Sequence, residues 1–169
     1  AASKPLLTEV TCSARPDQFS RYPLKEAAPF IDFLHLSIDE GHENLELYDR
    51  LSDLRQYHKK LAIQIVVSNR TVKELEWKIK KIKASGMWTI IMPAAPLDKA
   101  EQILPDLREF VTEVARLKKL YPYTILTSDF MLGNLLKSPG GCSASSIVID
   151  GGGKLYYPCR VLEKKTIDL

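Results

Sequence analysis

Apolar and polar positions alternate with two different periods along this chain. Short runs of β-branched and other apolar residues predict strands at 6–12, 32–39, 61–69, 87–92 and 123–127. Between these runs, apolar residues recur every three or four positions and predict helices near 24–30, 47–57, 72–82 and 107–120. This alternation predicts an α/β fold built from βα units, with a parallel sheet and helices packed outside it.

Local signals mark the ends of two of these helices. Thr71 and Glu74 have the spacing of a capping box, in which a hydroxyl and a carboxylate bind free backbone N–H groups. Asn44 is a predicted N-cap for the helix near 47–57. Gly86 is a predicted C-cap for the helix at 72–82. The lysines at positions 78, 80, 81 and 83 of that helix are expected to form a solvated face.

The predicted strand at 32–39 has one apolar and one polar face. Its apolar side chains are Leu34, Leu36 and Ile38, and its polar ones are His35, Ser37 and Asp39. Parallel strands are usually covered on both faces, so a polar face needs an explanation. It is either the interior of an incomplete barrel that holds a polar ligand or the solvated face of an edge strand. The pattern alone leaves both interpretations open.

The pattern changes after residue 131. Short strand-like runs at 146–150 and 154–157 flank three glycines and predict a β-hairpin. Cys142 and Cys159 lie just outside the two arms, so an antiparallel hairpin would bring their thiols together. Paired thiolates suit a soft metal or an iron–sulfur cluster, but a disulfide or two unrelated small residues fit the spacing as well. Cys12 stands alone and is expected to be a packing residue.

Composition narrows the function classes. The 169 residues carry 24 basic and 21 acidic side chains, and a net charge of +3 is too small and too dispersed to indicate nucleic-acid binding. No apolar run approaches the ~18 residues that span a bilayer, and no signal-peptide pattern is present, so we expect a cytoplasmic protein without a membrane partner. Phosphate-binding loops, dinucleotide fingerprints and hydrolase elbows are absent from the sequence.

Four segments together resemble the radical S-adenosylmethionine (radical SAM) superfamily. LHLSIDEGHEN at 34–44 looks like that family's fourth strand, IQIVVSNRT at 63–71 like its fifth, and MWTIIMPA at 87–94 like its sixth. CSASSIVIDGGGKLYYPC at 142–159 is similar to the opening of a SPASM or twitch extension. The resemblance implies that residues 1–132 form the second half of a partial (β/α)6 barrel, and residues 133–169 an incomplete Cys-containing hairpin extension.

The resemblance also implies roles for individual residues. Ser37 and Asp39 would contact the ribose or methionine part of S-adenosylmethionine, with Ser68 and Asn69 as polar neighbours of the cofactor. Met92 and Pro93 would border its adenine, and the first two ligands of an auxiliary iron–sulfur cluster would be Cys142 and Cys159. The parent enzyme would use a [4Fe–4S] cluster and the cofactor to generate a 5′-deoxyadenosyl radical, which abstracts hydrogen from a substrate that the sequence does not identify.

This chain departs from the family pattern in several ways. The Cys-x3-Cys-x2-Cys motif that binds the catalytic cluster is absent, as is the Gly-Gly-Glu segment of the second strand. Five residues separate Gly153 from Cys159, where the extension usually has four. The resemblance therefore implies a fragment of an enzyme whose catalytic ligands lie outside this chain. In such a fragment the first strand would be an open sheet edge, which predicts dimerisation or poor solubility.

Two other classes of function remain open at this stage. The chain could be a stand-alone α/β binding or scaffold module in which Cys142 and Cys159 hold a structural zinc together with two further ligands. It could also be an unrelated α/β enzyme that uses Asp39 and His42, because His42 follows a glycine in a loop at the carboxyl end of a strand.

Overall fold

The main body of the protein is a four-stranded parallel sheet covered by helices on one face. The computed structural model describes residues 7–15, 21–94, 103–137, 148–149, 152, 154–157 and 165–168. The strands follow each other in chain order and are β1 (Glu9–Ser13), β2 (Phe33–Ser37), β3 (Leu61–Val67) and β4 (Trp88–Pro93). Every neighbouring pair is parallel, which confirms the predicted α/β class.

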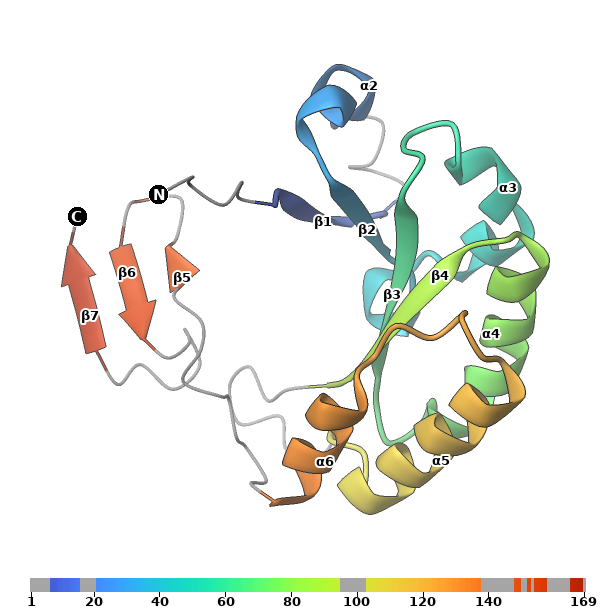
Figure 1. The fold of residues 1–169 in the computed structure, drawn as a ribbon. Coiled ribbons are helices and arrows are strands. Elements are labelled where there is room, and N and C mark those ends of the chain that lie inside the picture. The colour runs from blue at the N-terminus through green and yellow to red at the C-terminus, as the bar shows by residue number, and fades with distance from the viewer. Residues whose placement is uncertain are drawn as a thin grey trace, which may run out of the picture.

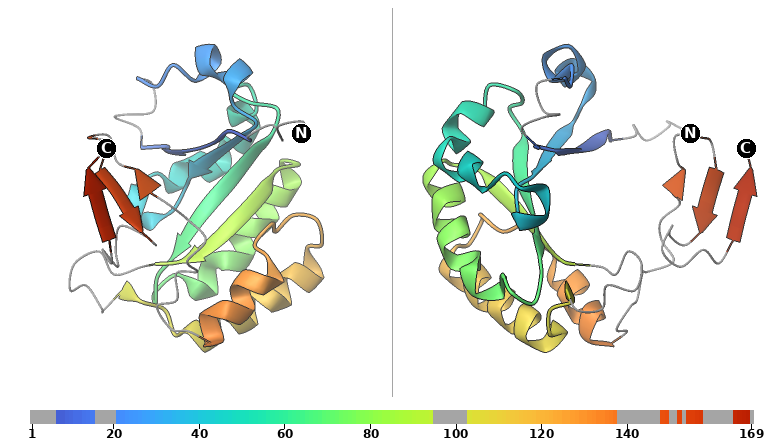
Figure 2. Two further views of the ribbon diagram at one scale, coloured as in Figure 1. Left: turned by 60° about the vertical axis from the view of Figure 1, so that its left-hand side comes forward. Right: turned by 180° about the vertical axis from the view of Figure 1, so that it is seen from behind.

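Helices α2 (Leu24–Ala27), α3 (Leu51–Leu54) and α4 (Leu75–Ala84) lie in the connections between these strands, and α5 (Leu107–Leu120) and α6 (Asp129–Lys137) follow β4. Helices α3, α4 and α5 lie along the same face of the sheet, and α6 lies against α5 (Figure 1). The two views in Figure 2 show the same layering. The longest described helix, α5, has 14 residues, so within the described residues no helix is long enough to cross a bilayer.

The hydrophobic core lies between the sheet and these helices. The strands contribute alternate residues whose side chains are fully buried, including Leu36, Ile63 and Ile91. Helices α4 and α5 contribute the residues that recur at helical spacing, namely Leu75, Ile79, Ile82, Phe110, Val114 and Leu117. The apolar stripes that the sequence predicts for these two helices are therefore confirmed.

The C-terminal region forms a second, antiparallel sheet. Its strands are β5 (Val148–Ile149), β6 (Lys154–Tyr157) and β7 (Lys165–Asp168), in that order. The pairing of β5 with β6 confirms the predicted hairpin, and β7 is a strand that the sequence pattern did not predict.

The fifth parallel strand predicted at 123–127 is wrong in extent. The segment makes only one isolated bridge to β4, between Thr89 and Ile125. Tyr123 has a φ of 68°, outside the extended region, so the strand cannot start there. At the other end, the Thr127 hydroxyl takes the place of a backbone partner: it accepts from the Ile91 N–H at 2.7 Å and donates to the Ile91 carbonyl at 3.1 Å.

The predicted helix starts are also different in the structure. Thr71 and Glu74 do not form a capping box, because the Thr71 hydroxyl accepts a hydrogen bond from the Ser68 N–H at 2.9 Å and Glu74 pairs with Lys78. A 3₁₀ helix over Val72–Glu74 leads into α4 instead. Asn44 does precede a 3₁₀ helix, Leu45–Asp49, but its side chain turns back to strand β2 and caps no helix. Local spacing predicted where these helices begin and not which groups bind their ends.

Helix α4 ends as its glycine predicts. Gly86 has a φ of 65°, and its N–H donates to the Lys83 carbonyl while the Met87 N–H donates to the Ile82 carbonyl. These are the two hydrogen bonds of a Schellman motif, which needs a left-handed residue at this position. A Cβ added to Gly86 would also lie 3.1 Å from the Arg55 guanidinium.

Substituting Gly86 with alanine is expected to lower the free energy of unfolding by about 1–2 kcal/mol, because an L-residue is strained in the left-handed region. Gly133→Ala is the matched control: Gly133 lies inside α6, and a Cβ there meets nothing within 4 Å. That change is expected to raise stability by about 0.5–1 kcal/mol. Urea denaturation measures both, and equal effects of the two substitutions would contradict the assignment.

The face of the sheet opposite the helices is partly open. Strand β2 lies between β1 and β3, so the interpretation of its polar face as a solvated edge strand is wrong. Its polar side chains are buried even so. The strand residues on this open face, as their alternation and register give them, are Glu9, Thr11, Ser13, Phe33, His35, Ser37, Ala62, Gln64, Val66, Trp88, Ile90 and Met92.

Candidate functional site

The carboxyl ends of parallel strands form the edge at which α/β proteins most often bind ligands. Ser37 ends β2, Ser68 and Asn69 follow β3, and Met92 and Pro93 end β4. The register pairs Val66 with Met92 and Val67 with Pro93. The structure therefore brings the six predicted cofactor contacts, Ser37, Asp39, Ser68, Asn69, Met92 and Pro93, to one edge of the main sheet. Cys142 and Cys159 lie outside the described residues.

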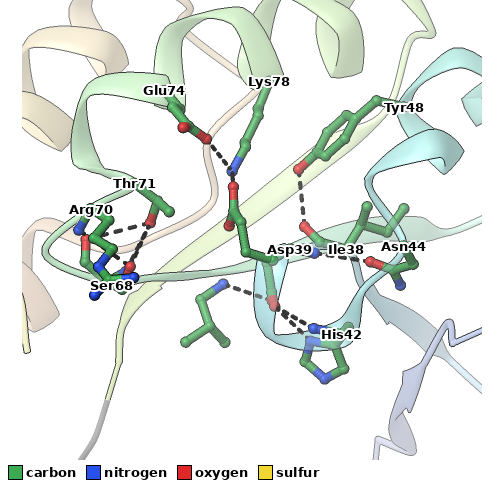
Figure 3. Close-up of polar contacts among 12 residues, drawn as sticks. Ile38, Asp39, His42, Asn44, Tyr48, Ser68, Arg70, Thr71, Glu74 and Lys78 are labelled. Atoms are coloured by element: carbon green, nitrogen blue, oxygen red, sulfur yellow. Dashed lines mark hydrogen bonds and ion pairs between the residues drawn. The ribbon is translucent and has the colours of Figure 1, made fainter. Parts of the chain in front are cut away.

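Asp39 is the centre of the hydrogen bonds at this edge (Figure 3). Its Oδ1 accepts from the backbone N–H of His42 at 3.1 Å and lies 2.8 Å from the same residue's Nδ1. Its Oδ2 accepts from the Val66 N–H of strand β3 at 3.2 Å. One buried carboxylate thus caps the 3₁₀ helix Glu40–His42 and ties that turn to the neighbouring strand.

Two further buried side chains hold the end of β2. The Asn44 amide donates to the Ser37 carbonyl at 2.9 Å and accepts from the Asp39 N–H at 3.1 Å. The Tyr48 hydroxyl donates to the Ile38 carbonyl at 3.0 Å. Burial, with the nearby carboxylates of Glu40 and Asp39, raises the pKa of Tyr48 well above its usual range, so the phenol stays neutral. The turn after β2 is therefore fixed by its own side chains before any ligand binds.

Lys78 corrects the prediction of a solvated lysine face. Its side chain is 0% exposed, and its ammonium group bonds to Glu40 and lies 3.4 Å from a Glu74 carboxylate oxygen (Figure 3). Lys80 and Lys81, by contrast, lie on the exposed side of α4. The ammonium group of Lys78 links helix α4 to the turn that follows β2.

The pairing with Lys78 changes the acidity of Glu40. Burial alone would raise the pKa of this carboxyl, but the hydrogen bonds and positive charge of Lys78, with hydrogen bonds from the Glu40 backbone and Glu74, outweigh it and hold the pKa below its ordinary value. Glu40 is therefore ionised at neutral pH and pairs with a charged lysine beneath the carboxyl edge.

The turn after β3 is built from hydroxyl groups. The Thr71 hydroxyl accepts from the Ser68 N–H at 2.9 Å, and the Ser68 hydroxyl accepts from the Arg70 N–H at 3.3 Å. The Asn69 N–H donates to the Ile103 carbonyl at 3.1 Å, which ties the turn to the segment before α5. Ser68 is thus half-buried in the turn, and Asn69 lies exposed beside it.

These residues differ in what they can still offer a ligand. Two hydrogens already reach Asp39 Oδ1 and one reaches Oδ2, so of the carboxylate's four lone-pair positions one on Oδ2 remains among the described contacts. Met92 is 39% exposed and presents a thioether that can pack on a flat apolar ring. Among these residues Met92 is therefore open to a ligand, and the buried Asp39 acts mainly as a positioning group.

Metal ligands are not gathered in the described part of the chain. Within those residues no three His, Cys, Asp or Glu side chains converge on a point that could hold a metal ion. Cys12 packs against the core, and burial raises the pKa of its thiol, as expected for a packing residue. The alternative site of Asp39 and His42 is present as a close pair, but three of the four lone-pair positions of Asp39 are used in fixing the turn.

Comparison of the chain with protein-family models, with curated proteins and with solved structures gives no match. The fold and the site define an α/β protein. The strands of its parallel sheet follow each other in chain order, and the turns at their carboxyl ends are held by hydrogen bonds from side chains of the chain itself.

Sequence reasoning missed three residues that build this edge. They are Asn44, whose side chain bonds to the end of strand β2, and the buried Tyr48 and Lys78. A signal for Lys78 was present, since it lies three positions after Leu75 and four before Ile82, on the buried face of α4. No comparable signal existed for Asn44, whose amide bonds to backbone atoms five and seven residues away.

Proposed function

We propose that this chain is part of a radical SAM enzyme and that the carboxyl edge of its main sheet supplies part of the S-adenosylmethionine pocket. One observation carries the proposal. The six residues to which the family resemblance assigns cofactor contacts come from three separate strand ends, and all lie at the same edge of a parallel sheet. Sequential strand order and helices on one face are also the arrangement of a (β/α) barrel segment.

The chain's own residues would bind and orient the cofactor. The Met92 thioether would pack against the adenine, with Pro93 beside it. The Ser37 hydroxyl and the remaining acceptor of Asp39 would bind ribose hydroxyl groups, and Ser68 and Asn69 would border the same pocket. When bound together, S-adenosylmethionine and a [4Fe–4S] cluster supply a carbon radical for hydrogen abstraction, and the protein holds the reacting groups in place and excludes water.

Titration of S-adenosylmethionine into the ¹⁵N-labelled chain tests this proposal. Amide signals of residues 37–39, 66–69 and 92 are expected to shift together, and Met92→Glu is expected to abolish the shifts because it places a charge against the adenine. Lys119→Ala, an exposed residue in the last turn of helix α5, is the matched control and is expected to leave them unchanged.

Shifts confined to the groove between α4 and α5, or none at any concentration, would contradict the proposal. Metal analysis after anaerobic reconstitution then separates the remaining classes. Iron and sulfide retained by the chain, and lost in the Cys142→Ser and Cys159→Ser variants, support an auxiliary cluster. Zinc in their place favours the stand-alone binding module.

A further inference from the structure

A cavity lies at the amino ends of strands β2 and β3, at the opposite end of the strands from the carboxyl edge. Its volume is about 690 Å³, within the range of about 300–1,000 Å³ that is usual for small-molecule sites. One wall is the segment before β2, with Ala28, Pro29, Ile31 and Asp32, and the other is the loop 55–60 before β3. Neither wall contributes a group to the carboxyl edge, so this cavity needs a separate explanation.

His58 joins the two walls of this cavity. Its Nε2 lies 2.9 Å from the Ile31 carbonyl oxygen, and because a carbonyl only accepts hydrogen bonds, Nε2 is the donor. Its Nδ1 accepts from the Lys60 N–H at 3.1 Å. The Lys60 carbonyl in turn accepts from the Leu34 N–H of β2 at 3.1 Å. These hydrogen bonds hold the walls together, and they leave the other side chains of the loop to face a ligand.

Cationic side chains outnumber acidic ones around this cavity. Arg55, Lys59 and Lys60 line it, and Asp32 is the one carboxylate among the described lining residues. The Asp32 Oδ2 already accepts from the Thr8 N–H at 2.8 Å, so part of this carboxylate is bound to the chain itself. Three cations and one carboxylate leave a formal excess of two positive charges. That excess matches a phosphate monoester, which carries about −1.5 to −2 charges at neutral pH.

Arg55 and Lys59 retain the hydrogen-bond donors that such an anion needs. One N–H of the Arg55 guanidinium donates to the Ser85 carbonyl at 3.3 Å, which leaves four of its five donors without a partner among the described residues. The ammonium group of the exposed Lys59 has no described partner either. Lys60 differs, because its ammonium group lies 4.9 Å from the centre of the Phe33 ring and adds charge rather than a free donor.

Apolar groups line the rest of the cavity. Pro29 and Ile31 form part of one wall, and the half-buried Tyr57 belongs to the other. Small-molecule sites typically combine such apolar surface with a few charged groups that fix the orientation of the ligand. The lining therefore suits an organic molecule with an anionic end better than a bare inorganic anion.

We propose that this cavity binds a small soluble molecule that carries a phosphate monoester group. The Arg55 guanidinium donates to two phosphate oxygens, as its planar geometry allows, and the Lys59 ammonium group donates to the third. The organic part of the ligand packs against Ile31 and Tyr57. This inference rests on the cavity at the amino ends of the strands and does not require the cofactor proposed for the carboxyl edge.

Phenyl phosphate tests this site, because it joins a phosphate monoester to a flat apolar ring. At about pH 7.5, above its second pKa of about 6, it is expected to shift the ¹⁵N amide signals of the loop 55–60 and of Ile31 until they saturate. Arg55→Gln is expected to raise the dissociation constant about tenfold, and Lys59→Gln a few-fold. Lys73→Gln removes an exposed lysine at the opposite end of β3 and is the matched control, with no change expected.

Two comparisons separate a phosphate site from diffuse surface charge. Phenol has the ring without the phosphate and is expected to give no saturating shifts. Arg55→Lys keeps the charge without the planar fork and is expected to bind phenyl phosphate more weakly. Full affinity in Arg55→Lys, or an equal loss in Lys73→Gln, overturns the proposal.

A lipid headgroup offers the same phosphate chemistry from a membrane surface. Binding to phosphatidylcholine vesicles that contain phosphatidic acid, with none to phenyl phosphate, also overturns the proposal of a soluble ligand. Arg55 and Lys59 are both exposed, so their variants are expected to keep the spectrum of the folded protein. If Arg55→Gln does not fold, the Lys59→Gln variant decides the question.

Discussion

Replacing Lys78 with alanine is expected to lower the free energy of unfolding by about 3–5 kcal/mol, the range for removing one partner of a buried ion pair. The side chain is fully buried among the core residues of α4, so alanine leaves a cavity and two carboxylates, Glu40 and Glu74, without their shared cation. Lys78→Met, which fills the space without the charge, is expected to cost less. Urea denaturation at neutral pH measures both changes.

Two controls make this result specific. Lys80→Ala removes a lysine of the same helix whose side chain is 61% exposed, and no measurable change is expected. The second control is pH: because Glu40 has a lowered pKa in the folded protein, its contribution is complete above the ordinary glutamate pKa and is lost as the pH falls through the folded value. The Lys78→Ala protein should therefore lose less stability on acidification than the unsubstituted protein. An equal loss of unfolding free energy at low pH in the two proteins would contradict the pairing of Lys78 with Glu40.

Replacing Asp39 with asparagine is expected to lower the free energy of unfolding by about 2–4 kcal/mol, although the two side chains have the same shape. Backbone N–H groups bond to both carboxylate oxygens, from His42 to Oδ1 and from Val66 to Oδ2. Asparagine has only one oxygen, so its NH₂ group must face one of these donors and leave it unpaired. Denaturant titration gives the free energy, and ¹⁵N spectra show which amide is lost.

Asp49→Asn is the matched control for this substitution. Asp49 pairs with Lys81 on the surface and its side chain is 75% exposed, so little change in stability is expected. If Asp39→Asn were as mild as Asp49→Asn, the carboxylate would not be holding the turn, and its proposed place beside the cofactor would be its main role.

The order of the elements could be predicted from the sequence because it depends on local periodicity. Four of the five predicted parallel strands lie where the apolar runs predict them, within a few residues. The fifth failed at Tyr123, where the backbone enters the left-handed region although its neighbours have high β propensity. The capping box failed for a similar reason, since Thr71 has a second partner, Ser68, which the spacing to Glu74 does not reveal.

The sequence predicted where the candidate site lies in the fold, but it did not predict the hydrogen bonds and ion pairs that hold the site together. Asp39 lies at a strand end, as its place in the pattern predicts, but the strand N–H that it binds belongs to Val66, 27 residues away. Lys78 has its main partner in Glu40, at a separation of 38 residues. Contacts over such distances depend on the packing of α4 against the turn after β2, and no local pattern encodes them.

The strand order has a consequence for how the protein is made. Each strand pairs with the one before it, and the paired residues Glu9 and Phe33, Leu34 and Leu61, and Ala62 and Trp88 are 24 to 27 positions apart. No strand has to be inserted between two that are already paired. Each βα unit can therefore dock on its predecessor as it leaves the ribosome, so assembly of the main sheet can keep pace with translation.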